Sequence, residues 1–276
     1  MDLDHASLCQ GLLSLASAGL CHRFDRHGSD DRRQGPRQRS SGPIRHGSGA
    51  VKSARSRLGV AVLALVISAC QQPAMAEQAY RAPDAAVRAN ETPGRHTAIF
   101  AGGCFWGMEA VFSHLKGVSS VVSGYTGGNR VQADYETVSS GTTGHAESVR
   151  VTYDPSVIRY DQLLQVFFGV ASDPTQLNRQ EPDVGTQYRN ALFPADKEQA
   201  RVAAGYIAQL RRLDPWKRPI VTRIEAFKGF YPAEDYHQDF ALKNPDHGYI
   251  RRWDAPKVAA LQRTFPQFWK STFTPR

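Results

Sequence analysis

Cys104 is the residue of this 276-residue chain best suited to act as a nucleophile. It follows Gly102, Gly103 and an apolar stretch, residues 97–101, that predicts a buried strand, and apolar side chains recur at helical spacing over residues 105–116. The thiol is therefore expected at the N-terminus of a helix, where unpaired N–H groups and the helix dipole favour a thiolate. A buried structural cysteine fits the same pattern, since free cysteines are often simply buried.

Two aromatic residues and one acidic residue could complete a site around this thiol. Phe105 and Trp106 follow it directly and would form an apolar pocket beside it. Residues 145–153 alternate as a half-buried strand does, which places Glu147 on the face that carries two valines. A carboxyl on such a face is either paired with a cation or kept protonated by desolvation, and a protonated glutamate can act as a general acid. A strand-end carboxylate bonded to a backbone amide is the competing interpretation.

Other polar residues give weaker signals. Asp183 and Tyr188 share a dense polar stretch, and the hydroxyls of Tyr188 and Tyr135 could each donate to a ligand oxygen, although a single loop tyrosine more often serves packing. Glu234 and His237 have E-x-x-H spacing, which can supply two metal ligands, but without a partner motif a capped helix is the simpler interpretation. A histidine could also activate the cysteine as in a cysteine protease, yet no orienting asparagine is recognisable.

The remaining periodicity predicts an irregular alternation of helices and strands. Residues 135–144, rich in glycine and hydroxyl groups, are expected to form a loop. Strands are predicted over 118–125 and 220–227, and helices over 161–170, 195–213 and 256–270.

The N-terminal part of the chain differs in composition from the rest. Residues 22–50 hold seven arginines and almost no apolar residue, so they cannot offset their ordering entropy. Residues 1–50 are accordingly interpreted as a disordered leader or as sequence that is not translated in the cell, with the true start near Val51. An Arg-rich run could also contact nucleic acid, but no binding motif accompanies it.

Residues 51–76 have the layout of a secretory signal. A basic segment precedes about ten apolar residues, too few to span a bilayer, which needs ~20. Cys70 ends a sequence that resembles the bacterial lipoprotein cleavage box, whereas residues 74–76 fit ordinary signal cleavage. Both sites stay open, with lipidation of Cys70 favoured, and the expected location is the periplasm or the cell envelope.

The ordered domain is predicted over residues 96–276, after a flexible Ala/Pro-rich tether at 77–95. The formal charge of +8 is misleading, because seven basic and five acidic residues precede Val51 and three basic residues lie in the signal. Without those residues the net charge is close to +3, so no acidic polymer is implied as a partner. Cys104 is the domain's single cysteine and cannot form a disulfide within it.

Four short motifs together resemble the type A peptide-methionine sulfoxide reductases. The resemblance runs from about Ala98 to about Trp253, and the order of the four motifs makes it specific. They are Gly-Cys-Phe-Trp-Gly at 103–107, Gly-His-Ala-Glu at 144–147, Asp-Val-Gly-Thr-Gln-Tyr-Arg at 183–189 and Tyr-His-Gln at 236–238.

This resemblance implies an α/β fold of the two-layer α+β kind, with a mixed central sheet, flanking helices and long irregular loops. It implies reduction of the S epimer of methionine sulfoxide, free or in proteins, with no metal and no organic cofactor. Cys104 would attack the sulfoxide sulfur and Glu147 would protonate its oxygen, leaving methionine and a cysteine sulfenic acid.

The resemblance also implies roles for the substrate-binding residues. Phe105 and Trp106 would hold the substrate methyl group. Tyr135 and Tyr188 would hydrogen-bond the sulfoxide oxygen, and Asp183 would help to order the site.

Two departures from the family pattern affect these expectations. Many relatives resolve the sulfenic acid with a later cysteine, but none follows Cys104 here, so a thioredoxin-like protein or a small thiol must attack Cys104 directly, unless Cys70 reaches it. Glu181 and Pro182 stand where a glycine is expected, which leaves the shape of that loop open.

The function expected from these observations is an exported, monomeric repair reductase for oxidised methionine in envelope proteins. A lipoprotein that only binds Met-rich partners is a second hypothesis, and a thiol peroxidase is a third.

Overall fold

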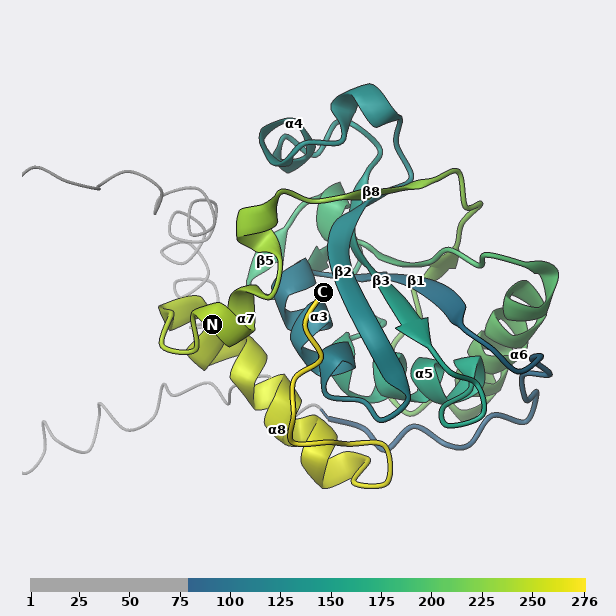
Figure 1. Ribbon diagram of the computed structural model, residues 1–276. Coiled ribbons are helices and arrows are strands. Elements are labelled where there is room, and N and C mark those ends of the chain that lie inside the picture. The colour runs from purple at the N-terminus through teal and green to yellow at the C-terminus, as the bar shows by residue number, and fades with distance from the viewer. Residues whose placement is uncertain (1–78) are drawn as a thin grey trace, which may run out of the picture. The chain divides into compact units, whose positions relative to one another are not determined.

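A mixed sheet of six strands, with helices packed against it, forms the centre of residues 79–276, the part of the chain that the computed structural model describes (Figure 1). Its strand order is β7-β6-β1-β3-β2-β8, and every neighbouring pair is antiparallel except β6 and β7. Two further short strands, β4 and β5, form a separate hairpin. The strands are β1 (His96–Gly102), β2 (Val118–Thr126), β3 (Ala146–Tyr153), β4 (Arg179–Gln180), β5 (Asp183–Val184), β6 (Asn190–Leu192), β7 (Arg223–Ile224) and β8 (Phe230–Pro232).

Six α-helices accompany these strands among the described residues. The longest, α6, begins after Asp196, whose side chain accepts a hydrogen bond from the Gln199 amide, and ends at Asp214 in the left-handed region. The helices are α3 (Phe105–Ser113), α4 (Tyr135–Ser139), α5 (Tyr160–Val166), α6 (Lys197–Leu213), α7 (Phe240–Lys243) and α8 (Ala255–Thr264). The predictions near 161–170, 195–213 and 256–270 thus correspond to helices, the last of which is shorter than expected.

Two predicted segments differ from the structure. Residues 135–144 do not form a loop throughout but begin with α4, because the Asp134 side chain caps the helix by accepting from the Thr137 amide at 3.0 Å. The strand expected over 220–227 pairs only at Arg223 and Ile224, where β7 lies beside β6 at the edge of the sheet.

Helix α3 is buried along its whole length. All nine of its residues are buried, because β2 and β3 cover one side and α8 packs against another. The helix carries large apolar side chains around most of its circumference, as a helix buried on several sides must. The single apolar face expected from the sequence therefore understates how enclosed this element is.

The strand register brings the start of α3 next to the start of β3. Phe100 in β1 lies opposite Val149 in β3, so continuing this antiparallel pairing by two residues places Gly102 beside Glu147. On its other side β3 pairs with β2, where Tyr125 lies opposite Glu147. The predicted buried face of β3 is confirmed, with Glu147 only 2% exposed.

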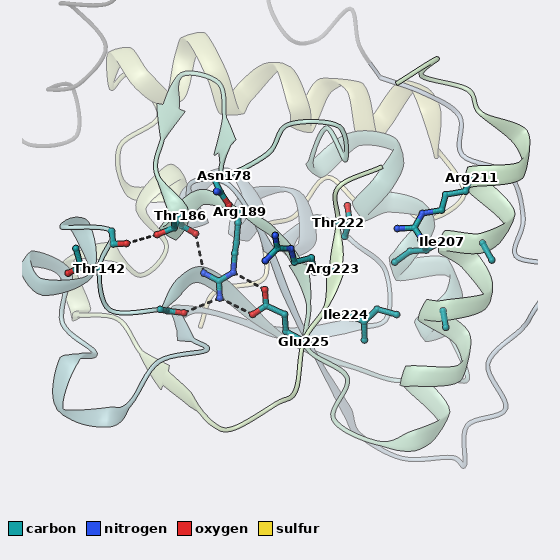
Figure 2. Close-up of a pocket in the computed structure, with 14 residues that line it drawn as sticks. Thr142, Asn178, Thr186, Arg189, Ile207, Arg211, Thr222, Arg223, Ile224 and Glu225 are labelled. Atoms are coloured by element: carbon teal, nitrogen blue, oxygen red, sulfur yellow. Dashed lines mark hydrogen bonds and ion pairs between the residues drawn. The ribbon is translucent and has the colours of Figure 1, made fainter. Parts of the chain in front are cut away.

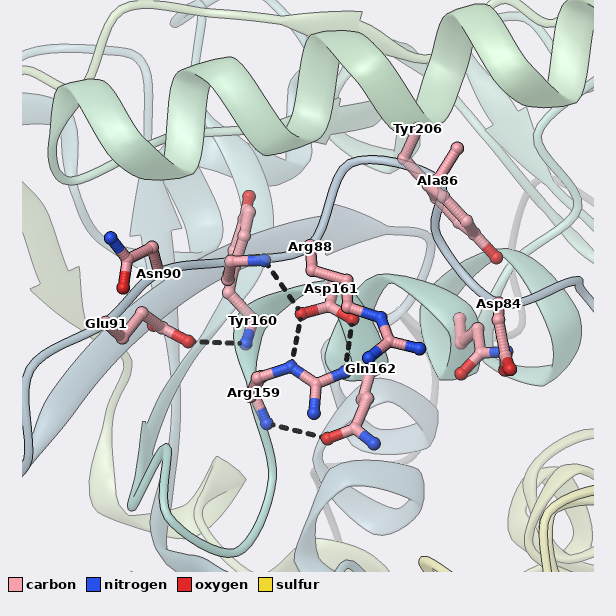
Figure 3. Close-up of polar contacts among 12 residues, drawn as sticks. Asp84, Ala86, Arg88, Asn90, Glu91, Arg159, Tyr160, Asp161, Gln162 and Tyr206 are labelled. Carbon is pink, nitrogen blue, oxygen red and sulfur yellow. Dashed lines mark hydrogen bonds and ion pairs between the residues drawn. The ribbon is translucent and has the colours of Figure 1, made fainter.

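The flexible tether predicted over 77–95 is wrong for residues 79–91, which pack against α5 and α6. Ala82, Ala85 and Ala89 are buried there. Figure 3 shows this segment running alongside α5, where the Ala89 amide donates to Asp161 Oδ1 at 3.0 Å and Glu91 Oε2 accepts from the Tyr160 amide at 2.9 Å.

Side chains of α6 complete the attachment. Gln209 accepts from the Ala86 amide at 2.7 Å and donates to the Asp84 carbonyl at 2.8 Å, and the Tyr206 hydroxyl donates to the Pro83 carbonyl at 2.7 Å. Side chains from distant helices thus satisfy backbone groups that no strand or helix of this segment could satisfy. The folded unit consequently includes residues that the composition assigned to a linker.

The predicted leader at 1–50, the signal at 51–76 and the lipidation site Cys70 all lie outside the described residues. Within residues 79–276, none of the helices combines the length and the apolar character needed to cross a membrane.

Candidate active site

Cys104 occupies the N-cap position of α3, as the sequence predicts. Its side chain lies in a nearly closed environment, with the residue 3% exposed. The next amide, that of Phe105, donates to Glu147 Oε2 at 3.0 Å. The Glu147 carboxyl, at the start of β3, is therefore held against the backbone of the residue that follows Cys104, at the positive end of helix α3.

The turn before Cys104 depends on a glycine. Gly103 has φ +97°, a conformation that L side chains rarely adopt, and a Cβ there would come within 2.5 Å of Gln180 Cβ. Gln180 is held by Ser172, whose hydroxyl donates to its Oε1 at 2.7 Å. The hairpin β4–β5 thus closes directly over the backbone that presents the thiol.

The loop whose shape the sequence leaves open is the turn of this hairpin. Glu181 and Pro182 connect β4 to β5 through a cis peptide bond, and Gln180 pairs with Asp183 across the turn. The departure from the expected glycine is thus accommodated within a regular two-stranded ribbon.

Phe105 and Trp106 lie in an aromatic cluster. The Trp106 ring stacks on Phe240 with centroids 3.8 Å apart and an interplanar angle of 7°, and its Nε1 donates to His237 Nδ1 at 3.2 Å. Phe105 lies 4.9 Å from the His237 ring, between centroids. The histidine is therefore part of the wall that orients both aromatic side chains.

Tyr135 reaches the same cluster from α4. Its ring centroid lies 4.4 Å from that of His237, and its amide donates to Glu234 Oε1 at 2.9 Å. The other oxygen of Glu234 accepts from the Tyr125 hydroxyl at 2.9 Å. Both carboxylate oxygens of the E-x-x-H pair thus serve hydrogen bonds, and no group of three potential metal ligands gathers within residues 79–276.

Tyr188 is buried in a 3-10 turn between β5 and β6. The following residue, Arg189, donates to the carbonyls of Gly144 at 3.0 Å and His145 at 3.1 Å and forms a two-bond ion pair with Glu225 at 2.9 Å. These contacts tie the turn that carries Tyr188 to the chain just before β3.

Asp183 connects to the thiol through a residue that the sequence did not single out. Its Oδ2 accepts a hydrogen bond from the Tyr249 hydroxyl. Burial raises the pKa of Asp183 to about 6, although Tyr249 and Lys257 both act to lower it. The pKa of Tyr249 is raised chiefly by burial and then by the charges of Cys104 and Asp183, which places the tyrosine within electrostatic range of both.

A buried ion pair behind α3 was also not predicted. Asp254 is fully buried, and a Cβ on Gly107 would meet its Oδ1 at 2.2 Å and Lys257 Nζ at 3.2 Å. Lys257 Nζ lies 3.8 Å from Asp254 Oδ1. Burial raises the pKa of Asp254 to about 7, the charge of Lys257 lowers it, and the charge of Asp183 raises it further. The only sequence signal here was Pro256, the second residue of α8.

Comparison with known proteins decides which family uses this arrangement. A family model described as peptide methionine sulfoxide reductase matches residues 96–268. The chain belongs to this family.

Relatives of type A match most of their own length. A peptide methionine sulfoxide reductase MsrA 2 of Mesorhizobium japonicum is 58% identical over 177 residues, covering 64% of this chain and 91% of the relative. An MsrA of Deinococcus radiodurans is 54% identical over 168 residues, covering 61% of this chain and 81% of the relative.

Solved structures agree with these relatives. The methionine sulfoxide reductase A of Corynebacterium diphtheriae matches with a TM-score of 0.51 and 32% identity, over 61% of this chain and 89% of that one. The reduced form of Mxr1 from Saccharomyces cerevisiae matches with the same TM-score and identity, over 58% of this chain and 91% of that one. The predicted α/β fold is confirmed.

Membership of this family also confirms the predicted activity. The protein is an oxidoreductase that reduces the S epimer of methionine sulfoxide with electrons from a thiol reductant. These findings do not support the alternatives of a binding lipoprotein or a thiol peroxidase.

Proposed function

We propose that Cys104 attacks the sulfoxide sulfur while Glu147 protonates the sulfoxide oxygen. The hydrogen bond from the Phe105 amide to Glu147 Oε2 carries this proposal, because it fixes a carboxyl one residue from the thiol. The start of a helix favours a thiolate, and burial disfavours the charged form of a carboxyl.

The electrons and atoms of this step balance without a cofactor. The thiolate electron pair forms a bond to the sulfoxide sulfur as the sulfoxide oxygen takes the proton from Glu147. Transfer of the resulting hydroxyl to the Cys104 sulfur releases methionine and leaves a sulfenic acid. The substrate sulfur gains the two electrons that the cysteine sulfur loses.

The surrounding residues would bind the substrate. Phe105 and Trp106 follow Cys104 directly in the chain and lie in the aromatic cluster around His237, which supports a role in holding the methyl group. The hydroxyls of Tyr135 and Tyr188 would hydrogen-bond the sulfoxide oxygen. Asp183 would order the site by accepting a hydrogen bond from the Tyr249 hydroxyl.

The sulfenic acid would be reduced by an external thiol. Cys104 is the single cysteine of residues 79–276. A first thiol would condense with the sulfenic acid to form a mixed disulfide and water, and a second thiol would release Cys104. A thioredoxin-like protein or a small thiol would supply both, and the enzyme would act as a monomer.

A single-turnover experiment on the full chain tests this mechanism. Without any reductant, an S-sulfoxide should yield one equivalent of methionine and one sulfenic acid, trapped on Cys104 by a dimedone-type reagent. Cys104→Ser should yield neither, and Glu147→Gln should slow the step strongly while substrate still binds. Cys70→Ser is the matched control and should behave like the unmodified chain. Full turnover by Cys104→Ser would overturn the proposal.

Export to the cell envelope is the proposed location, supported by the signal-like composition of residues 51–76. If Cys70 is the lipidated first residue of the mature protein, cells fed labelled palmitate should label the protein, and Cys70→Ser should abolish the label. Cleavage after Ala76 would instead give an unlabelled product beginning at Glu77. A mature product beginning at Met1 would refute export.

A further inference from the structure

A groove lies between α6, β7 and the loop before β3. Its volume is about 910 Å³, within the range of ~300–1,000 Å³ typical of ligand sites. Ile207 and Arg211 line it from α6, Thr222, Arg223 and Ile224 from the β7 region, and Thr142 from the opposite loop (Figure 2). None of these residues has a part in the proposed reaction.

Two arginines in this groove have charges that the fold does not neutralise. Arg211 and Arg223 are exposed and form neither an ion pair nor a hydrogen bond with any residue from 79 to 276. Arg189, by contrast, forms an ion pair with Glu225 and donates hydrogen bonds to backbone carbonyls. Figure 2 shows Arg211 reaching from α6 toward Thr222, while Arg223 extends toward Arg189. The net unpaired charge inside the groove is therefore positive.

The groove also offers groups that fit a polypeptide. β7 is an edge strand, paired only with β6 in the described sheet, and the neighbouring Glu225 amide bonds to Leu192 in that strand. Strand geometry then points the backbone groups of Ile224 away from β6. Ile224 is 41% exposed, and the buried Thr222 Oγ1 has no hydrogen-bond partner among the described residues.

We infer that this groove binds an extended acidic segment of a partner protein. Carboxylates would pair with Arg211 and Arg223, apolar side chains would cover Ile207 and Ile224, and the peptide backbone would use the open edge of β7. A free phosphate fits less well, because it would use the charges of Arg211 and Arg223 but would leave the exposed Ile224 side chain and the open edge of β7 without a partner.

Fluorescence anisotropy with the full chain tests this inference. The probe is a labelled hexapeptide that alternates Glu with Val, and its control replaces every Glu by Gln. Only the acidic peptide should bind, and its affinity should fall as salt rises. The double variant Arg211→Ala/Arg223→Ala should bind about tenfold more weakly, the loss expected for two charge-assisted contacts at a partly exposed site.

Arg212→Ala is the matched control, because Arg212 shares the last turn of α6 but does not line the groove. It should leave binding unchanged, and all variants should reduce free methionine sulfoxide at the normal rate, which shows that they fold. Equal binding of both peptides, no binding at all, or an equal loss in Arg212→Ala would overturn the inference. Displacement of the acidic peptide by inorganic phosphate at lower concentration would identify a phosphate site instead.

Discussion

Glu109 provides a quantitative test of how completely the interior around α3 excludes water. Its side chain is fully buried, and neither carboxyl oxygen makes a well-formed hydrogen bond within the described part of the chain. Burial therefore raises its pKa from 4.5 to about 8, although the nearby backbone N–H groups of Asp239 and Phe240 act to lower it. Glu109→Gln replaces this group with one of similar shape that does not titrate.

The sign and size of the effect come from proton linkage. Above pH 4.5 the unfolded chain loses the Glu109 proton while the folded protein keeps it until about pH 8. The folded state thus binds more protons, and Glu109 lowers the free energy of unfolding by about 1.4 kcal/mol per pH unit across this window. The accumulated loss is about 3 kcal/mol at pH 7 and about 5 kcal/mol above pH 8.

Urea unfolding of the unmodified protein and of Glu109→Gln, repeated from pH 5 to pH 8, measures this difference. The Glu109→Gln variant should become progressively more stable relative to the unmodified protein as pH rises. Glu198→Gln is the matched control: Arg201 and the Asn90 amide lower the pKa of Glu198 to about 2, so its contribution is constant in this window. Parallel stability curves for Glu109→Gln and the unmodified protein would refute the reasoning.

Three further predictions concern the groups around the site. Lys257→Met should raise the pKa of the thiol at the start of α3, because a cation beside Gly107, in the first turn of that helix, is lost. Absorbance of the thiolate at varied pH measures this, and an equal shift in Lys116→Met, beyond the C-terminal end of α3, would contradict it. The reduction rate should fall below pH 6 as Asp183 gains a proton, and a profile for Asp183→Asn that keeps this limb would contradict that origin. Asp161→Ala should speed amide hydrogen exchange in residues 79–92 severalfold while the sheet stays protected, and unchanged exchange would mean that this carboxylate does not hold the segment.

The strand-to-helix turn around Cys104 could be predicted because its signals are local. An apolar run, two glycines and helical spacing lie within about twenty residues, and the alternation of β3 assigns Glu147 to the buried face without knowledge of its neighbours. What the sequence could not supply was the tertiary arrangement that brings the Glu147 carboxyl to the Phe105 amide. The family motifs supplied that relation instead.

The packing of the segment at 79–91 could not be predicted, because the interactions that order it are not local in the sequence. Its residues are polar or small, and it has no periodicity, so composition alone indicates a linker. Its order comes from hydrogen bonds to Asp161, Tyr206 and Gln209, which lie 72 to 125 positions away in the chain. Tyr249 and Asp254 escaped notice similarly, because their significance depends on the C-terminal part folding back against α3.

Three buried carboxyls lie in and around α3: Glu109 in the helix itself, Asp183 in β5 and Asp254 just before α8. Burial raises the pKa of Glu109 to about 8 and that of Asp254 to about 7, so near neutral pH Glu109 is mostly protonated and Asp254 is partly protonated. Asp183, with a pKa raised to about 6, is mostly ionised at that pH. An ionised acid near the start of α3 would repel a thiolate there and compete with it for the helix dipole. Because Glu109 and Asp254 carry less than their full charge near neutral pH, they oppose Lys257 and the helix terminus less in favouring the thiolate of Cys104. The stability that Glu109 costs above pH 5 is thus a consequence of the same burial that suits the helix to thiol chemistry.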